Sequence, residues 1–229
     1  MTICQVYIAT LQAEGQLQYE SQTGNRRHWS PLHLQQSVLD RACGTHALLV
    51  AISLVSRTPR GAIEKMTDAT RGPWRRFWTT ALEHYFEGTS PKDLEALAAC
   101  IGSVTTRRIR IAGPEQLHRA CLATIESGGV PLLDLQGPNI AHWTVALGVE
   151  TRMAVPSAIL CLDPSCGEPW ASFTNARLDI SKPVQPARGK PLFNYRDTDG
   201  RLKLARARAV LAVHPAFVTP SGDAARRIT

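Results

Sequence analysis

Cys43 is the residue whose type and position are best suited to start a reaction. It lies directly before the apolar run Thr45–Val55, which predicts a buried helix that begins at the thiol. The first turn of a helix presents unpaired N–H groups and the positive end of the helix dipole, and both stabilise a thiolate. A thiolate is the form of cysteine that attacks a carbonyl carbon. Cys43 is therefore the candidate nucleophile.

Two residues further along the chain supply the partners that a nucleophilic thiol needs. His142 begins a strand-like run that ends at Val149, and Asp163 follows the strand-like run Ala158–Leu162. An imidazole keeps the thiol ionised and protonates the leaving amine, while a carboxylate orients that imidazole. If the two strands pair side by side, we expect Asp163 to reach Nδ1 of His142. The order Cys, His, Asp is that of a thiol protease.

Acyl transfer also needs a donor for the oxyanion besides the backbone N–H of Cys43. A side-chain amide suits this role because it is neutral and does not quench the thiolate. We predict Gln36 as the donor, with Gln35 as the alternative. Trp143, next to the histidine, is expected either to shield the ion pair and contact substrate or to serve packing alone. Gly44, which follows the nucleophile, is assigned to substrate binding.

His46 is a competing base because it follows the thiol by three residues on the same predicted helix. A base so close along one helix rarely reaches the attacking sulfur, so His142 is favoured. Each candidate residue, taken alone, also fits a structural role, since a cysteine before a helix, a histidine on a strand and an Asp-Pro turn are all common. Their joint order along the chain favours catalysis.

The composition describes a single globular domain. The chain has 229 residues with 44% hydrophobic content. No run approaches the roughly 20 apolar residues of a membrane helix, and the N-terminus lacks a signal-peptide pattern, so we expect a soluble cytoplasmic protein without membrane contacts. Six cysteines dispersed through a chain of this size predict free thiols in a reducing compartment. Cys161 and Cys166 lack a second ligand pair, so neither zinc nor another cofactor is predicted.

The chain carries a net charge of +7, and only five of its 26 basic residues are lysine. This balance fits an acidic protein or peptide substrate, a translocated effector that avoids lysine modification, or simply the codon usage of a GC-rich genome. Because the basic residues form no single block, nucleic-acid binding is the less favoured interpretation. The arginines that such binding would use are Arg71, Arg75, Arg76, Arg107, Arg108 and Arg110.

The order of elements predicts an α+β fold. Because helical patterns come first and strands cluster late, a helical half that carries the nucleophile helix is expected to pack on an antiparallel sheet. Residues 1–30 are interpreted as a strand or hairpin extension, and residues 31–175 as the catalytic core. Residues 176–229 are interpreted as a loop, a hairpin and a strand that complete the same domain and end in a loose tail. Helices are predicted over 44–56, 74–86, 91–101 and from Pro114 to a stop at Gly128, and strands over 103–111, 130–135, 142–149, 158–162 and 209–213.

Six short motifs, in this order, resemble the C39 and C39-like peptidases, from about Gln35 to Trp170. They are the upstream glutamine, Asp-x-x-Cys-Gly at 40–44, Ser-Pro-x-x-Leu-x-x-Leu-Ala-x-x-x-Gly at 90–102, Gly-Gly-x-Pro at 128–131, His-Trp-Thr-Val-Ala-Leu-Gly at 142–148 and Leu-Asp-Pro-x-x-Gly at 162–167. The resemblance implies a papain-like fold and a cysteine peptidase. The roles that it implies are Cys43 as nucleophile, His142 as base, Asp163 as the group that orients it and Gln36 as oxyanion donor.

The chain departs from that family in several respects. The family's oxyanion glutamine commonly stands six residues before the cysteine, where this chain has Ser37. Cys-Gly-Thr-His replaces the Cys-Gly-Ser-Cys-Trp of papain. The membrane segments of the transporter-linked members have no counterpart in this sequence, and the regions 1–30 and 176–229 match nothing in the family.

Three functions fit these residues. The first is a cysteine peptidase that hydrolyses a peptide or isopeptide bond through a thioester. The second is a glutamine deamidase or transglutaminase-type effector that uses the same triad. The third is a non-catalytic binding module of the same fold. Rapid alkylation of Cys43, and loss of turnover in Cys43→Ala, would separate the two enzymes from the binding module.

Overall fold

The computed structural model describes residues 2–5, 10–11, 16–37, 40–169, 172–186 and 190–216. Its helices are α1 (Cys43–Ser56), α2 (Arg60–Lys65), α3 (Gly72–Glu83), α4 (Pro91–Ile101) and α5 (Pro114–Glu126), with a 3-10 turn over Met66–Asp68. Its strands are β1 (Thr2–Gln5), β2 (Thr10–Leu11), β3 (Leu17–Thr23), β4 (Arg26–Pro31), β5 (Val104–Arg110), β6 (Val130–Gly137), β7 (Ile140–Arg152), β8 (Val155–Leu162), β9 (Ala176–Val184), β10 (Leu192–Asp197) and β11 (Leu202–Pro215).

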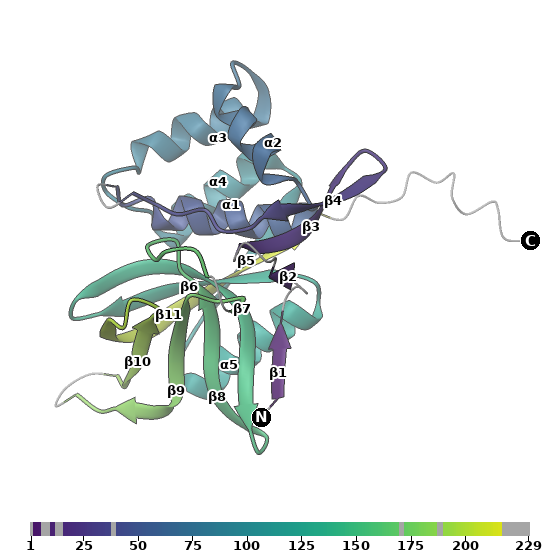
Figure 1. Ribbon diagram of the computed structural model, residues 1–229. Helices are drawn as coiled ribbons and strands as arrows, with labels where there is room; N and C mark the ends of the chain where they lie inside the picture. The colour runs from purple at the N-terminus through teal and green to yellow at the C-terminus, as the bar shows by residue number, and fades with distance from the viewer. Residues whose placement is uncertain are drawn as a thin grey trace, which may run out of the picture.

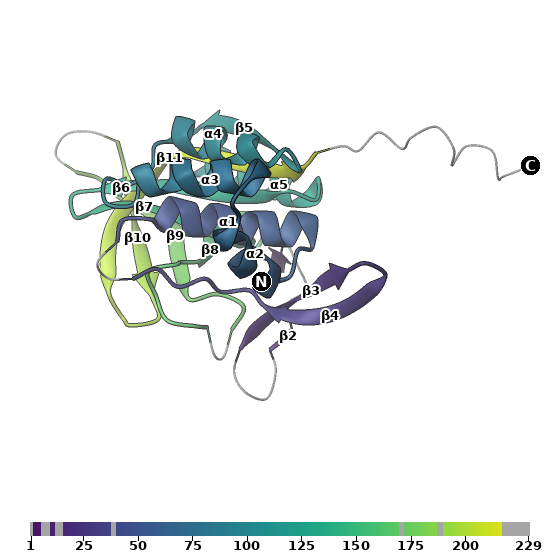
Figure 2. The ribbon, with the colours of Figure 1, turned by 90° about the horizontal axis from the view of Figure 1, so that it is seen from above.

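The main body is a closed antiparallel barrel of six strands (Figure 1). The strand order is β7-β6-β11-β10-β9-β8, and the barrel closes because β8 also pairs with β7. Two strands extend it, since β1 pairs with β7 and β5 pairs with β11. β2, β3 and β4 form a separate sheet, and Figure 2 shows the β3–β4 hairpin projecting from one side of the molecule.

This architecture corrects the predicted fold class. The expected α+β, papain-like arrangement, a helical half packed on an antiparallel sheet, is wrong, because the described part of the chain is mostly β, with five short helices beside a closed barrel and a second sheet. Local periodicity reports single strands but not the pairing of distant strands that closes a barrel. The region 176–229, predicted to begin with a loop, instead begins with the strand β9, which runs from Ala176 to Val184.

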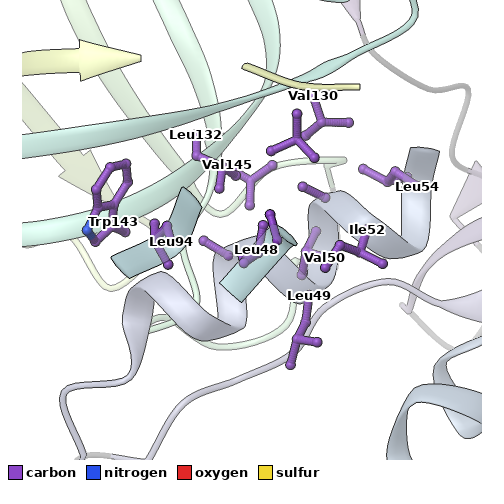
Figure 3. Close-up of a cluster of buried hydrophobic side chains, with 14 of the residues drawn as sticks. Leu48, Leu49, Val50, Ile52, Leu54, Leu94, Val130, Leu132, Trp143 and Val145 are labelled. Carbon is purple, nitrogen blue, oxygen red and sulfur yellow. The ribbon is translucent and has the colours of Figure 1, made fainter. Parts of the chain in front are cut away.

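Side chains of the barrel strands alternate between two hydrophobic clusters. The inner cluster takes residues from all six barrel strands and from α5, and includes Leu133 and Ala146. The outer cluster takes Leu132 and Val145 and joins them to α1 and α4 (Figure 3). α1 is buried along most of its length because it packs against β6, β7 and β11 as well as against α2 and α4. This packing fixes the end of α1 that carries Cys43.

Local signals at the helix ends agree with the sequence. α1 occupies the predicted apolar run. α4 begins with the predicted cap, because the Ser90 hydroxyl accepts from the Asp93 N–H and the Asp93 carboxylate accepts from the Ser90 N–H. It ends at Gly102, whose φ of +72° is the left-handed conformation that glycine adopts readily. The predicted C-terminal tail lies, from residue 217 on, outside the described residues.

Candidate active site

Cys43 is the first residue of α1 and lines a cleft of about 770 Å³ together with Gln36, His142 and Trp143. The residue is 8% exposed, and its Sγ lies 3.9 Å from the backbone oxygen of Arg41. The first N–H groups of a helix have no partner within the helix. The thiol therefore lies beside backbone N–H groups that have no partner within the helix.

A carboxylate that the sequence analysis did not select holds the chain before Cys43. Asp40 is 6% exposed and accepts hydrogen bonds from the backbone N–H groups of Ser37 at 2.8 Å and Ala42 at 3.0 Å. It also accepts from the hydroxyl of Tyr85 at 3.3 Å. These bonds fix the direction in which the chain enters α1. The sequence held only a general signal, because an aspartate side chain often accepts from nearby backbone N–H groups in a turn; the N-cap of α1 is Ala42, which has no side-chain cap.

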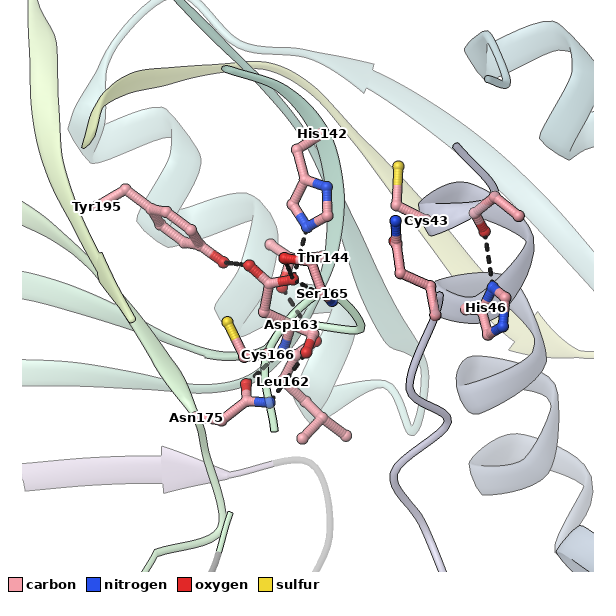
Figure 4. Close-up of polar contacts among 12 residues, drawn as sticks. Cys43, His46, His142, Thr144, Leu162, Asp163, Ser165, Cys166, Asn175 and Tyr195 are labelled. Carbon is pink, nitrogen blue, oxygen red and sulfur yellow. Dashed lines mark hydrogen bonds and ion pairs between the residues drawn. The ribbon is translucent and has the colours of Figure 1, made fainter. Parts of the chain in front are cut away.

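His142 and Asp163 lie together, as their two strands predicted. β7 and β8 pair so that Val145 stands opposite Leu162, and Nε2 of His142 lies 2.6 Å from Oδ1 of Asp163. The prediction differs in one atom, because it placed Nδ1 against the carboxylate. The second ring nitrogen instead lies on the side of Cys43 (Figure 4). The imidazole thus stands between the carboxylate and the thiol.

Four hydrogen bonds surround the carboxylate of Asp163, which is 1% exposed. Besides His142, the N–H and the hydroxyl of Ser165 each donate to Oδ1 at 2.7 Å, and the hydroxyl of Tyr195 donates to Oδ2 at 2.5 Å. The side chain of Asn175 holds the backbone of Asp163, accepting from its N–H at 2.6 Å and donating to its oxygen at 2.9 Å. Sequence reasoning missed Tyr195 and Asn175, because nothing local links them to Asp163.

The charges of this group favour an imidazolium beside a carboxylate. Burial lowers the pKa of His142, but hydrogen bonds with Asp163 and Cys43 and the charges of both outweigh burial and raise it to about 10. Burial raises the pKa of Asp163, but the hydrogen bond and charge of His142, with the bonds from Tyr195 and Ser165, hold it below its usual range. At neutral pH both groups are therefore ionised.

The two candidate oxyanion glutamines differ in position. Gln36 lines the cleft, whereas Gln35 is exposed and is not among the described lining residues. The N–H of Gln36 donates to the oxygen of Pro164 at 2.8 Å, which joins its loop to the turn after Asp163. Its Nε2 donates to the oxygen of Asp40 at 3.3 Å, and its buried Oε1 has no partner among the described residues. Gln36 is thus the glutamine whose amide is near Cys43.

Trp143 and Gly44 pack together beside Thr89. Trp143 is 4% exposed, its Nε1 donates to the oxygen of Thr89 at 2.9 Å, and it contributes to the cleft lining. A Cβ on Gly44 would come within 2.0 Å of Thr89 Oγ1 and 3.0 Å of Trp143 Cδ1. Gly44 is not among the described residues that line the cleft. The structure places this glycine in the close packing of α1, so the predicted contact with substrate has no support in the geometry.

His46, the competing base, is engaged by its own helix. Its Nδ1 lies 3.0 Å from the backbone oxygen of Ala42. Figure 4 shows the ring on α1, turned away from the group formed by His142 and Asp163. It is not among the described residues that line the cleft.

Within the described ranges, no group of three or more His, Cys, Asp or Glu side chains is arranged to hold a metal ion. The helices found there are also too short or too polar to cross a bilayer. Described cysteines that are free are Cys43, Cys100, Cys121, Cys161 and Cys166.

No protein-family model matches this sequence, and a search of the curated proteins finds no significant match.

Proposed function

We propose that the chain is a cysteine peptidase that hydrolyses a peptide or isopeptide bond through a thioester. One observation carries the proposal: Nε2 of His142 is 2.6 Å from Asp163, while the rest of the ring faces Cys43 in a cleft that both residues line. A thiol, a base and an orienting carboxylate in one row are the parts that thiol acyl transfer needs. Such rows occur on unrelated folds, so the barrel is compatible with this chemistry.

In the first half of the reaction, Sγ of the Cys43 thiolate attacks the carbonyl carbon, and the electron pair of the C=O bond moves onto oxygen. Backbone N–H groups at the start of α1 and the amide of Gln36 would donate to this oxyanion. The pair then returns to re-form C=O and the C–N bond breaks. The leaving amine takes the proton from Nδ1 of His142, which leaves a thioester and a neutral imidazole.

In the second half, a water molecule gives a proton to Nδ1 of His142 as its oxygen attacks the thioester carbon. The C–S bond then breaks, which releases the carboxylic acid and restores the thiolate and the imidazolium. Asp163 stays ionised throughout, because its hydrogen bonds stabilise the charged form. Its role is to hold the ring of His142 in one orientation.

Covalent labelling of the full chain tests the nucleophile. Iodoacetamide, followed by mass spectrometry of the digested protein, should give one fast adduct, on Cys43. Cys100 is the internal comparison, because it is half-buried while Cys43 is only 8% exposed, so accessibility alone favours Cys100. His142→Ala should slow the labelling of Cys43 by about 100-fold, as expected for loss of an acid–base partner.

The matched control is Cys100→Ala, which should leave the labelling of Cys43 unchanged. Equal labelling of Cys43 and Cys100, or labelling of Cys43 that does not respond to His142→Ala, would contradict the proposal.

The products of turnover distinguish hydrolysis of a substrate's peptide bond from other reactions of the thioester. A peptide library incubated with the protein should contain new termini, and none should form with Cys43→Ala. Conversion of glutamine to glutamate in uncut peptides, or linkage of glutamine to an added amine, would contradict peptidase activity and assign the thioester to deamidation or transamidation.

A further inference from the structure

A second cavity, of about 460 Å³, lies beside the catalytic cleft. It is bounded by β5, β11 and the start of α5. Its floor is apolar and buried, and includes Ile111, Leu117 and Phe193. Asp134 is the single acidic residue of the described lining. The basic residues of the lining are Arg108, Arg110, Lys190, Arg206 and Arg208.

Most of this positive charge is not neutralised within the protein. Arg208 donates to Asp134 at 2.9 and 3.1 Å, and Arg108 lies 3.5 Å from Glu95. In the described part of the chain, the other three basic residues of the lining have no ion-pair partner. They are Arg110, Lys190 and Arg206.

The strand geometry explains why the charges gather here. Arg108 and Arg110 are two residues apart on β5, so they point to the same face. β5 pairs with β11, where Ala209 stands opposite Arg110. The register of β11 against β6 shifts between Ala207 and Ala209, so Arg208 is the bulged residue. A bulge re-aims the side chain that it carries.

Arg208 and its partner Asp134 line both the basic cavity and the catalytic cleft. The cleft and the basic cavity therefore meet at this ion pair. A bound peptide that extends from the cleft along β11 would enter the basic cavity. Continuity of this kind favours a second part of the substrate as the occupant.

We propose that the basic cavity binds acidic side chains of the peptide substrate, next to the bond that is cut; this inference rests on the proposed peptidase function. Carboxylates complement the free cations at its rim. The apolar floor suits the methylene groups of glutamate or a neighbouring aliphatic side chain. Nucleic acid fits less well. Among the described lining residues the aromatic one is Phe193, and because it is only 4% exposed it offers no face on which a base could stack.

Binding to the full-length Cys43→Ala chain tests the inference without any turnover. The probe is a fluorescein-labelled peptide in which glutamate alternates with leucine, and the matched probe has glutamine for each glutamate. Fluorescence anisotropy should show that the glutamine peptide binds about tenfold more weakly than the glutamate peptide. Added salt should weaken the binding of the glutamate peptide and leave that of the glutamine peptide unchanged.

Two variants locate the site. Arg110→Ala combined with Arg206→Ala should weaken binding of the glutamate peptide about tenfold. Arg107→Ala is the matched control, because Arg107 is also exposed and on β5 but does not line the cavity. The inference would be overturned if the two peptides bound equally, or if Arg107→Ala weakened binding as much as the double variant does. It would also be overturned if an oligo-dT strand displaced the labelled glutamate peptide at a lower concentration than the unlabelled glutamate peptide does.

The active chain separates this inference from the proposed function. The Arg110→Ala and Arg206→Ala pair should raise KM for a glutamate-containing peptide, while kcat and the iodoacetamide labelling of Cys43 stay unchanged. Unselective labelling of the wild-type chain contradicts the catalytic assignment alone. Selective labelling without preference for the glutamate peptide contradicts the basic cavity alone.

Discussion

The thiol and the imidazole–carboxylate pair are held in place by different parts of the molecule. α1 packs on the barrel, but the direction in which the chain reaches Cys43 depends on neighbours in sequence, chiefly Asp40 three residues before it. Asp163 depends on contacts between distant segments, with His142 21 residues before it and Tyr195 32 residues after it. The comparison indicates that local changes should move the thiol, while changes in the barrel should destabilise the whole protein.

The largest loss of stability is expected when the carboxylate of Asp163, which joins distant segments, is removed. Asp163→Ala removes a buried carboxylate and leaves the imidazolium of His142 buried without its partner. We expect the free energy of unfolding to fall by about 3–5 kcal/mol, as for other broken buried ion pairs. Urea denaturation measures it. Asp163→Asn keeps the shape of the side chain and should lose less stability than Asp163→Ala. Equal stability of the wild type and Asp163→Ala would show that the pair of His142 and Asp163 does not stabilise the barrel.

A smaller effect should follow from pH. The pKa of His142 is raised to about 10 in the folded chain, above the 6.5 of an unperturbed histidine. The stability that this charge contributes is therefore fully present below pH 6.5 and is lost as the pH rises through about 10. The loss should be smaller than in Asp163→Ala, because neutral His142 still donates one ring N–H.

The pH effect is measured by denaturation across this range. His142→Gln is the control, since it lacks the titrating ring and should lose the step while keeping the contributions of other groups. In Asp163→Asn the step should move toward pH 6.5. A step that stays in place in Asp163→Asn would contradict the assignment.

Tyr195→Phe sharpens the comparison by removing one donor to Asp163 and leaving the ring in the inner cluster. We expect a loss of about 2 kcal/mol, because the acceptor is charged. Tyr19→Phe is the comparison, since that hydroxyl donates to the neutral backbone oxygen of Thr58 and should cost about 1 kcal/mol. Because the Tyr195 hydroxyl helps to hold the pKa of Asp163 down, an NMR titration should show a higher pKa for Asp163 in Tyr195→Phe and no change in Tyr19→Phe.

The smallest loss of stability is expected in the local half. Asp40→Ala removes the bonds to Ser37, Ala42 and Tyr85, and should cost about 1 kcal/mol, as for lost hydrogen bonds in a turn. The labelling of Cys43 should nevertheless slow severalfold, because the start of α1 is displaced. Gln116→Ala, which removes a bond to the Ala112 N–H before α5, should cost a similar amount and leave labelling unchanged. Equal labelling in both variants would contradict the local role of Asp40.

The same division decides what the sequence could predict. The start and end of α4 follow from Ser90, Asp93 and Gly102, and these were confirmed because caps act within a few residues. The pairing of β7 with β8 could also be anticipated, since the two strands are consecutive, and it brings His142 to Asp163. The catalytic roles of these residues stay predictions.

The closed barrel and the hydrogen bonds that Tyr195 and Asn175 make with Asp163 could not be predicted from the sequence. β10 pairs with β9 and β9 with β8, so Tyr195 reaches Asp163 across an intervening strand. Curvature and closure depend on the pairing of strands that are far apart in sequence, and no local pattern reports them. The predicted arrangement of a helical half on an antiparallel sheet was therefore the wrong fold class, while the elements themselves were mostly placed correctly.

The position of β11 bears on when the protein becomes competent during its synthesis. This strand lies between β6 and β10, and also carries β5 along its second half. A nascent chain that ends before Leu202 would leave all three of those strands with open edges. Translation must therefore proceed almost to the last described residue before these three strands gain their shared neighbour and the barrel can close.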